Sequence, residues 1–199
     1  MQITSETVKK LRDKTGVGMM DCKKALEETN GDFEKAVEIL RKKGIEVANK
    51  RSGRTASQGT VSSYIHMGGK IGVLVEVNCE SDFVAKSDDF NNFVKDVAMQ
   101  IAAASPDWVV REEVPEAVLN KEKEILKDQA LKTGKPEKVI EKIVEGKLGK
   151  FYSERCLMDQ HFVKDQDRTI KQLLDELMAK TGEKCIIRRF ARFQVGEEL

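Results

Sequence analysis

The sequence contains few of the side chains that build catalytic or metal sites. It has two histidines, His66 and His161, and four cysteines that form no C-x-x-C pair. It has no G-x-S-x-G motif and no phosphate-binding G-x-x-x-x-G-K-S/T motif. The wide spacing of the cysteines argues against a disulfide or metal framework and favours a reducing, cytoplasmic setting. We therefore expect a protein that is not an enzyme and that uses neither a metal nor a cofactor.

The chain also lacks long apolar segments and a strong charge of one sign. No apolar run approaches the length needed to span a bilayer, and the N-terminal segment MQITSETVKK has no signal-peptide character. Lys and Arg number 35 against 34 for Asp and Glu, which gives a net charge of +1. A dedicated nucleic-acid binder would show a basic excess. These features argue against a membrane location and against a specific nucleic-acid partner.

Residues 1–44 predict a module of three short helices. The first is expected to begin at Ser5, a candidate N-cap, and to end before Gly16 in the left-handed conformation. The second is expected to follow Gly18 and to stop at Asn30-Gly31. Asp32 then caps the third, which has a single apolar stripe and ends at Gly44. Residues 45–58 follow with the basic and Ser/Gly-rich composition of a linker.

Residues 59–199 predict an α+β domain with a three-stranded antiparallel sheet. Apolar residues recur at every second position in two strands, 60–67 and 71–77, around a tight Gly68-Gly69 turn. A helix starts at Ser87 and presents a buried stripe that includes Phe90, Val97 and Ile101. A final strand is expected in the apolar segment CIIRRFARFQV.

Two further helical features are expected in this domain. Residues 116–155 resemble an inserted hairpin of two charged amphipathic helices, broken at Gly134 and restarted at Pro136. Another helix is expected at about 168–180, with apolar residues that include Ile170, Leu174 and Leu177.

Two segments resemble the signature regions of the elongation factor Ts family. They are LRDKTGVGMMDCKKALEETNGDFEKAVEILRKKG and EVNCESDFVAK. The order of modules and the length match the short bacterial form, which has one α+β core. Members of this family are guanine-nucleotide exchange factors for elongation factor Tu. The resemblance thus implies this function, with GDP-bound and nucleotide-free elongation factor Tu as the partner, and it implies a homodimer.

The resemblance also implies which residues meet the partner. The N-terminal module would contact its nucleotide-binding domain through Leu11, Arg12, Met19 and Met20. Ser81, Asp82, Phe83 and Val84 would intrude beside its magnesium and phosphate site, where Asp82 would add negative charge or cap the turn that presents Phe83. Phe162 and Val163, in the segment DQHFV, would lie toward a second domain of the partner. Two positions depart from the usual family pattern: Ser81 replaces threonine, and His161 replaces proline.

The residues alone leave two of these positions open. Phe83 lies seven residues before Phe90, so one continuous helix would place it in the core stripe, whereas a fresh helix start at Ser87 would leave it on a protruding turn. Met19 and Met20 are adjacent and cannot both face inward, so we expect at least one of them to be exposed, which suits an adaptable contact surface. The alternative is that one lies in the core and the other is exposed without a role.

Two other classes of function remain alternatives. The three-helix unit has the general shape of a ubiquitin-associated-like module for unrelated partners, but that function would leave ESDFVAK unexplained. An RNA-binding protein could use the basic residues between Arg41 and Arg54, and its binding would depend steeply on salt.

Overall fold

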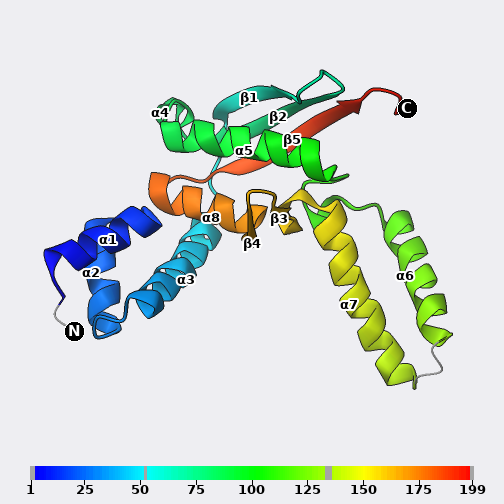
Figure 1. The fold of residues 1–199 in the computed structure, drawn as a ribbon, viewed down its shortest axis with the longest axis horizontal. Helices are drawn as coiled ribbons and strands as arrows, with labels where there is room; N and C mark the ends of the chain where they lie inside the picture. The colour runs from blue at the N-terminus through cyan, green and yellow to red at the C-terminus, as the bar shows by residue number, and fades with distance from the viewer. Residues whose placement is uncertain (1–2, 52, 133–135, 198–199) are drawn as a thin grey trace. The chain divides into compact units, whose positions relative to one another are not determined.

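The computed structural model describes residues 3–51, 53–132 and 136–197 (Figure 1). Helices and strands are mixed along the chain. In sequence order they are α1 (Ser5–Thr15), α2 (Met19–Glu28), α3 (Phe33–Arg51), β1 (Gln58–Ile65), β2 (Ile71–Cys79), α4 (Asp82–Ala85), α5 (Asp88–Ala104), η1 (Arg111–Glu113), α6 (Glu116–Leu131), α7 (Glu137–Arg155), η2 (Leu157–Asp159), β3 (His161–Phe162), β4 (Asp165–Thr169), α8 (Ile170–Thr181) and β5 (Ile186–Gln194).

The chain divides into two compact units. The first comprises Met1–Ser62, Glu76–Lys95 and Gln172–Arg188. The second comprises Ser63–Val75, Asp96–Lys171 and Arg189–Leu199. Within the described ranges, no helix combines the length and apolar character needed to cross a membrane.

The predicted α+β class and the three-stranded antiparallel sheet are confirmed. The strand order is β1-β2-β5, so the C-terminal strand pairs with the central strand of the hairpin. The hairpin turn requires two glycines, because Gly68 and Gly69 adopt φ values of 86° and 68°. A hydrogen bond of 2.9 Å from the Gly69 N–H to the His66 carbonyl closes the turn.

The two hairpin strands differ in which side chains are buried. On β2, Val73, Val75 and Val77 are buried, as an inward-facing apolar set should be. On β1, the predicted apolar set is exposed instead, and Val61 and Ile65 both face solvent. A period of two establishes that alternate side chains share a face but not which face meets the core, so the expected apolar alternation alone could not orient β1.

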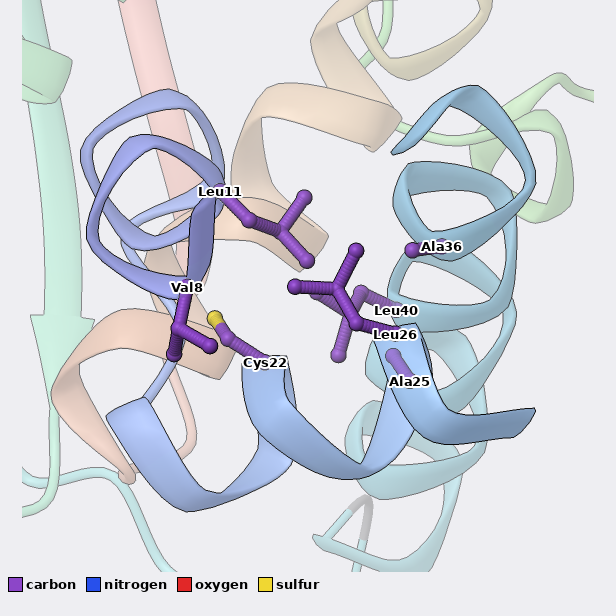
Figure 2. Close-up of a cluster of buried hydrophobic side chains, with 7 residues drawn as sticks. All are labelled: Val8, Leu11, Cys22, Ala25, Leu26, Ala36 and Leu40. Carbon is purple, nitrogen blue, oxygen red and sulfur yellow. The ribbon is translucent and has the colours of Figure 1, made fainter. Parts of the chain in front are cut away.

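The first three helices surround their own apolar cluster (Figure 2). Its buried members are Val8, Leu11, Cys22, Ala25, Leu26, Ala36 and Leu40. The predicted left-handed Gly16 is confirmed, with φ of 68°. The N-cap prediction was wrong by one residue: Thr4 caps α1, and its hydroxyl accepts a hydrogen bond from the Thr7 N–H at 3.2 Å.

The third helix is longer than predicted. It continues through Gly44 to Arg51 rather than ending at Gly44. A glycine inside a helix costs only about 1 kcal/mol relative to alanine, and good helix formers such as Lys42 and Lys43 precede this one. The division of the chain at 1–44, 45–58 and 59–199 stays a prediction.

The start of α5 is confirmed in detail. The Ser87 hydroxyl accepts a hydrogen bond from the Phe90 N–H at 3.3 Å, which is N-cap geometry. Phe90, Val97 and Ile101 are buried, so the predicted stripe is the inward face of this helix. The helix therefore begins after Phe83, and Phe83 lies outside its stripe.

The predicted pair of charged helices is also present. Helices α6 and α7 lie side by side (Figure 1), and Lys147 Nζ donates to Gln129 Oε1 between them at 2.8 Å. The predicted break at Gly134 lies outside the described residues.

One expected helix boundary was wrong, and a small sheet was not foreseen. Arg168 was expected to begin a helix, but it lies in β4, which pairs antiparallel with β3, and α8 begins at Ile170. Arg168 Nε instead donates to Asp165 Oδ2 at 2.6 Å within the strand. Such short polar strands have no strong periodic signal, because their pairing depends on residues brought together by the fold.

Candidate functional site

Phe83, the aromatic residue of the signature segment ESDFVAK, is exposed to solvent. It lies on the one-turn helix α4, and 83 % of its surface is exposed. Val84, the next residue, is 6 % exposed and packs inward. The alternative that placed Phe83 in the core is therefore excluded.

The turn that presents Phe83 is capped by Ser81, not by Asp82. The Ser81 hydroxyl accepts a hydrogen bond from the Val84 N–H at 3.3 Å. Asp82 instead accepts a hydrogen bond from Lys86 Nζ at 2.7 Å, and this contact lowers the pKa of its carboxyl group. Asp82 thus lies on the exposed face beside Phe83 as a carboxylate paired with the positive charge of Lys86.

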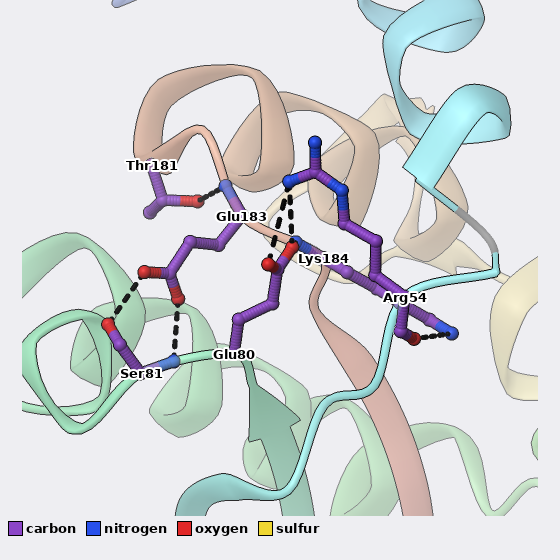
Figure 3. Close-up of polar contacts among 6 residues, drawn as sticks. All are labelled: Arg54, Glu80, Ser81, Thr181, Glu183 and Lys184. Carbon is purple, nitrogen blue, oxygen red and sulfur yellow. Dashed lines mark hydrogen bonds and ion pairs between the residues drawn. The ribbon is translucent and has the colours of Figure 1, made fainter.

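Ser81 is itself fixed by residues distant in sequence (Figure 3). The Glu183 carboxylate accepts hydrogen bonds from the Ser81 N–H at 2.9 Å and from the Ser81 hydroxyl at 2.6 Å. The buried Cys79 thiol donates to the Ser81 carbonyl at 3.1 Å. Burial, and next the charge of Glu183, raises the pKa of the Cys79 thiol, which keeps it protonated as a donor.

A second set of contacts holds the segment between α3 and β1 beside the turn that precedes α4 (Figure 3). The Lys184 N–H donates to Glu80 Oε1 at 2.6 Å, and Arg54 lies 3.4 Å from that carboxylate. Lys184 Nζ donates in turn to the Arg54 carbonyl at 2.8 Å. The end of the predicted linker is therefore bonded beside the turn that presents Phe83.

The N-terminal module offers a separate exposed surface. Met19 and Met20 are 41 % and 67 % exposed, so the prediction that they do not both face inward is confirmed and the alternative that places one of them in the core is excluded. Arg12 is also exposed. Leu11, by contrast, is fully buried in the cluster of Figure 2, so its side chain supports this surface from beneath.

The third predicted contact region, Phe162 and Val163, is held in place by hydrogen bonds to the buried Gln100. Gln100 is 0 % exposed; its side-chain amide donates to the His161 carbonyl at 3.1 Å and accepts from the Val163 N–H at 2.8 Å. Gln160 accepts a further bond from the same amide at 3.1 Å. Phe162 is buried between these backbone contacts, whereas Val163 is exposed, so only Val163 presents its side chain outward.

Several of these residues were missed in the sequence. Glu183 is separated from Ser81 by 102 positions, and Gln100 from Val163 by 63 positions. No local pattern joins residues so far apart, and a lone Glu or Gln in a charged chain is usually solvated. The one available signal was Gly182 after an apolar helix, which marks a C-terminal turn but not its partner.

The site offers shape and charge rather than reactive groups. Across the described part of the chain, no three His, Cys, Asp or Glu side chains are arranged to hold a metal ion. All four cysteines are buried free thiols, and burial raises the pKa of Cys156 to about 11 and of Cys185 to about 12. An exposed aromatic on a fixed turn suits insertion into another protein.

Comparison with known proteins adds an independent finding. A family model described as Elongation factor TS matches residues 2–197. Elongation factor Ts of Moorella thermoacetica is 62 % identical over 195 residues, which cover 98 % of this chain and 96 % of that protein. Elongation factor Ts of Geobacter sulfurreducens is 61 % identical over 199 residues, covering 100 % and 92 %. Elongation factor Ts of Syntrophus aciditrophicus is 60 % identical over 199 residues, covering 100 % and 99 %.

Proposed function

The chain belongs to the elongation factor Ts family, and we propose on that basis that it is a guanine-nucleotide exchange factor for elongation factor Tu. It would bind the GDP-bound and nucleotide-free partner and accelerate GDP release. We further propose that Asp82 and Phe83 form a wedge that displaces the elements around the magnesium and phosphates of the partner.

The exposed side chain of Phe83 is the observation that supports this proposal most. A large aromatic that is 83 % exposed contributes little to its own fold. Its backbone is nevertheless fixed, because Ser81 is bonded to Glu183 and caps the turn. A rigid turn that presents an apolar side chain loses little entropy on binding, as a protein contact requires.

The mechanism follows from reciprocal coupling between two ligands of the partner. If the factor weakens GDP binding, GDP weakens factor binding by the same ratio. GDP is held largely by backbone amides and by magnesium at the phosphates, so displacing these elements lowers its affinity. Burying one Phe supplies about 1.5–3 kcal/mol, which corresponds to about one to two decades of coupling.

A larger effect requires further contacts. We propose that Arg12, Met19 and Met20 form the surface that meets the nucleotide-binding domain of the partner, supported from beneath by Leu11. Exposed methionines adapt to a partner surface without a fixed shape. We propose that Val163 contacts a second domain of the partner and that the buried Phe162 fixes its backbone.

We also propose that the protein is a homodimer. Within the second unit, Ile65, Leu74 and Phe193 of the three strands are exposed apolar side chains. Exposed apolar side chains suit a contact between two copies. Analytical ultracentrifugation of the protein and of Phe193→Asp tests this: the unmodified chain should sediment as a dimer and the variant as a monomer.

The exchange function is tested by release of labelled GDP from purified elongation factor Tu. Stoichiometric protein should accelerate release by orders of magnitude, and the effect should change little between 50 and 200 mM salt.

An RNA-binding protein that uses Arg54 and its basic neighbours would instead bind RNA with steep salt dependence. A ubiquitin-associated-like module would retain its full binding when Phe83 is replaced. Unchanged GDP release in the presence of the protein would refute the proposal.

A further inference from the structure

Glu183 and Ser81 are both half-buried, and two hydrogen bonds join them. One carboxylate accepts both hydrogens that Ser81 can donate, at 2.9 Å from the backbone nitrogen and 2.6 Å from the hydroxyl oxygen (Figure 3). Hydrogen bonds to an ionised acceptor are stronger than those between neutral groups. Glu183 thereby orients the hydroxyl so that its lone pairs face the Val84 N–H.

All polar atoms of Ser81 are engaged in this arrangement. Its carbonyl accepts from the Cys79 thiol at 3.1 Å and from the Ala85 N–H at 3.2 Å, in addition to the contacts of its N–H and hydroxyl. Helix α4 has only four residues, and a single helical turn is not stable in isolation. The conformation of α4 therefore depends on bonds from outside the turn, and Glu183 supplies two of them.

Glu183 is well placed to do this because its own turn is fixed. Helix α8 ends at Thr181, whose hydroxyl accepts from the Glu183 N–H at 3.4 Å, and Gly182 reverses the chain with φ of 75°. The next residue, Lys184, bonds through its N–H to Glu80 at 2.6 Å. Two successive residues of the α8–β5 turn are thus bonded to two successive residues of the β2–α4 turn.

We propose that Glu183 is a positioning residue for nucleotide exchange, which keeps α4 folded so that Phe83 projects from a fixed backbone. This inference rests on the proposed function of Phe83. Glu183 does not need to touch the partner for this role. Without it, the turn must be ordered during binding, and the free energy available for displacing GDP is reduced by that ordering.

The experiment compares Glu183→Ala, Glu183→Gln, Phe83→Ala and the double variant Phe83→Ala/Glu183→Ala in the full chain. Glutamine retains an acceptor for the Ser81 N–H, so it serves as the conservative rescue. Glu124→Ala, at an exposed position of α6, is the matched control. Two quantities are measured: amide hydrogen exchange of residues 81–86 in the free protein, and stimulated release of labelled GDP.

We expect Glu183→Ala to speed amide exchange in residues 81–86 and to slow stimulated GDP release by about tenfold. In Glu183→Gln, both quantities should lie close to those of the unmodified chain. The double variant should release GDP no more slowly than Phe83→Ala, because Glu183 acts through Phe83. Glu124→Ala should change neither quantity.

Three results would overturn the inference. The first is unchanged amide exchange in Glu183→Ala. The second is faster amide exchange in Glu183→Ala together with normal stimulated GDP release, while Phe83→Ala slows GDP release. The third is a reduction of GDP release in the double variant that equals the product of the fold reductions in the two single variants. That result would mean that Glu183 acts independently of Phe83. Normal GDP release by Phe83→Ala would identify failure of the proposed function itself, and the inference would fail with it.

Discussion

Phe83 and Val84 are neighbours in α4 with opposite environments: the Phe83 side chain is 83 % exposed, whereas that of Val84 is 6 % exposed. The Val84 N–H also donates to the Ser81 hydroxyl that caps the turn. One residue therefore anchors the turn, and its neighbour is exposed to solvent. In the proposed function, fold stability and partner binding are assigned to two adjacent positions.

This separation predicts opposite results for two substitutions. Phe83→Ala should leave the melting temperature nearly unchanged. It should slow stimulated GDP release by about ten- to a hundredfold, because this ratio corresponds to the free energy of burying one aromatic side chain. Val84→Ala should destabilise the fold by about 1–3 kcal/mol, because it removes buried methyl groups. Thermal melts and GDP release on both variants check this. A large melting shift for Phe83→Ala with normal activity would contradict it.

The N-terminal module allows a similar comparison. The double variant Met19→Ala/Met20→Ala should melt like the unmodified chain but require about three- to tenfold more protein for half-maximal GDP release, since exposed contact area is lost. Leu11→Ala should lower the free energy of unfolding by about 2–5 kcal/mol, because Leu11 is fully buried. Titration of the factor and urea unfolding measure the two effects. Equal destabilisation by both variants would argue against an exposed contact surface.

Gln100 should be important for stability although it is polar. Gln100→Leu removes the acceptor of the Val163 N–H and the donor to the His161 carbonyl, so we expect a loss of about 1–3 kcal/mol. Amide exchange at Val163 should also become faster. Asn120→Leu, at an exposed position of α6, is the control and should change stability by less than about 0.5 kcal/mol. Equal stability of the two variants would mean that the buried network contributes nothing.

Cys185 should make stability depend on alkaline pH. Burial raises the pKa of its thiol to about 12, whereas an unfolded thiol titrates near about 8.5. Because the folded pKa is raised, the contribution is complete below about pH 8.5 and is lost as pH rises toward the folded value, at up to about 1.4 kcal/mol per pH unit. The stability advantage of the unmodified chain over Cys185→Ala should therefore shrink with rising pH.

Urea unfolding at pH 7.5, 8.5 and 9.5 measures this difference. Ile187→Val is the control, because Ile187 is buried nearby in sequence but has no titrating group. Its stability curve should run parallel to that of the unmodified chain. Parallel curves for Cys185→Ala as well would show that the thiol does not contribute to the pH dependence.

Much of the local structure was determined by short-range patterns in the sequence. The left-handed Gly16, the Gly68-Gly69 turn and the Ser87 cap were all predicted, and each is confirmed. These features depend on backbone conformation and on hydrogen bonds within about four residues, which a sequence states directly. The signature segments likewise indicated the family, because they are local strings of residues.

Other features were decided only by the tertiary structure. The outward face of Val61 and Ile65, the strand that contains Arg168 and the exposure of both Met19 and Met20 depend on what packs against each element. The sequence left Phe83 open between a core stripe and a protruding turn, and the structure decided that it is exposed. Glu183 reaches Ser81 across 102 positions, and only the folded chain brings that carboxylate to the turn. Periodicity describes one element at a time, whereas burial and long-range hydrogen bonds belong to pairs of elements.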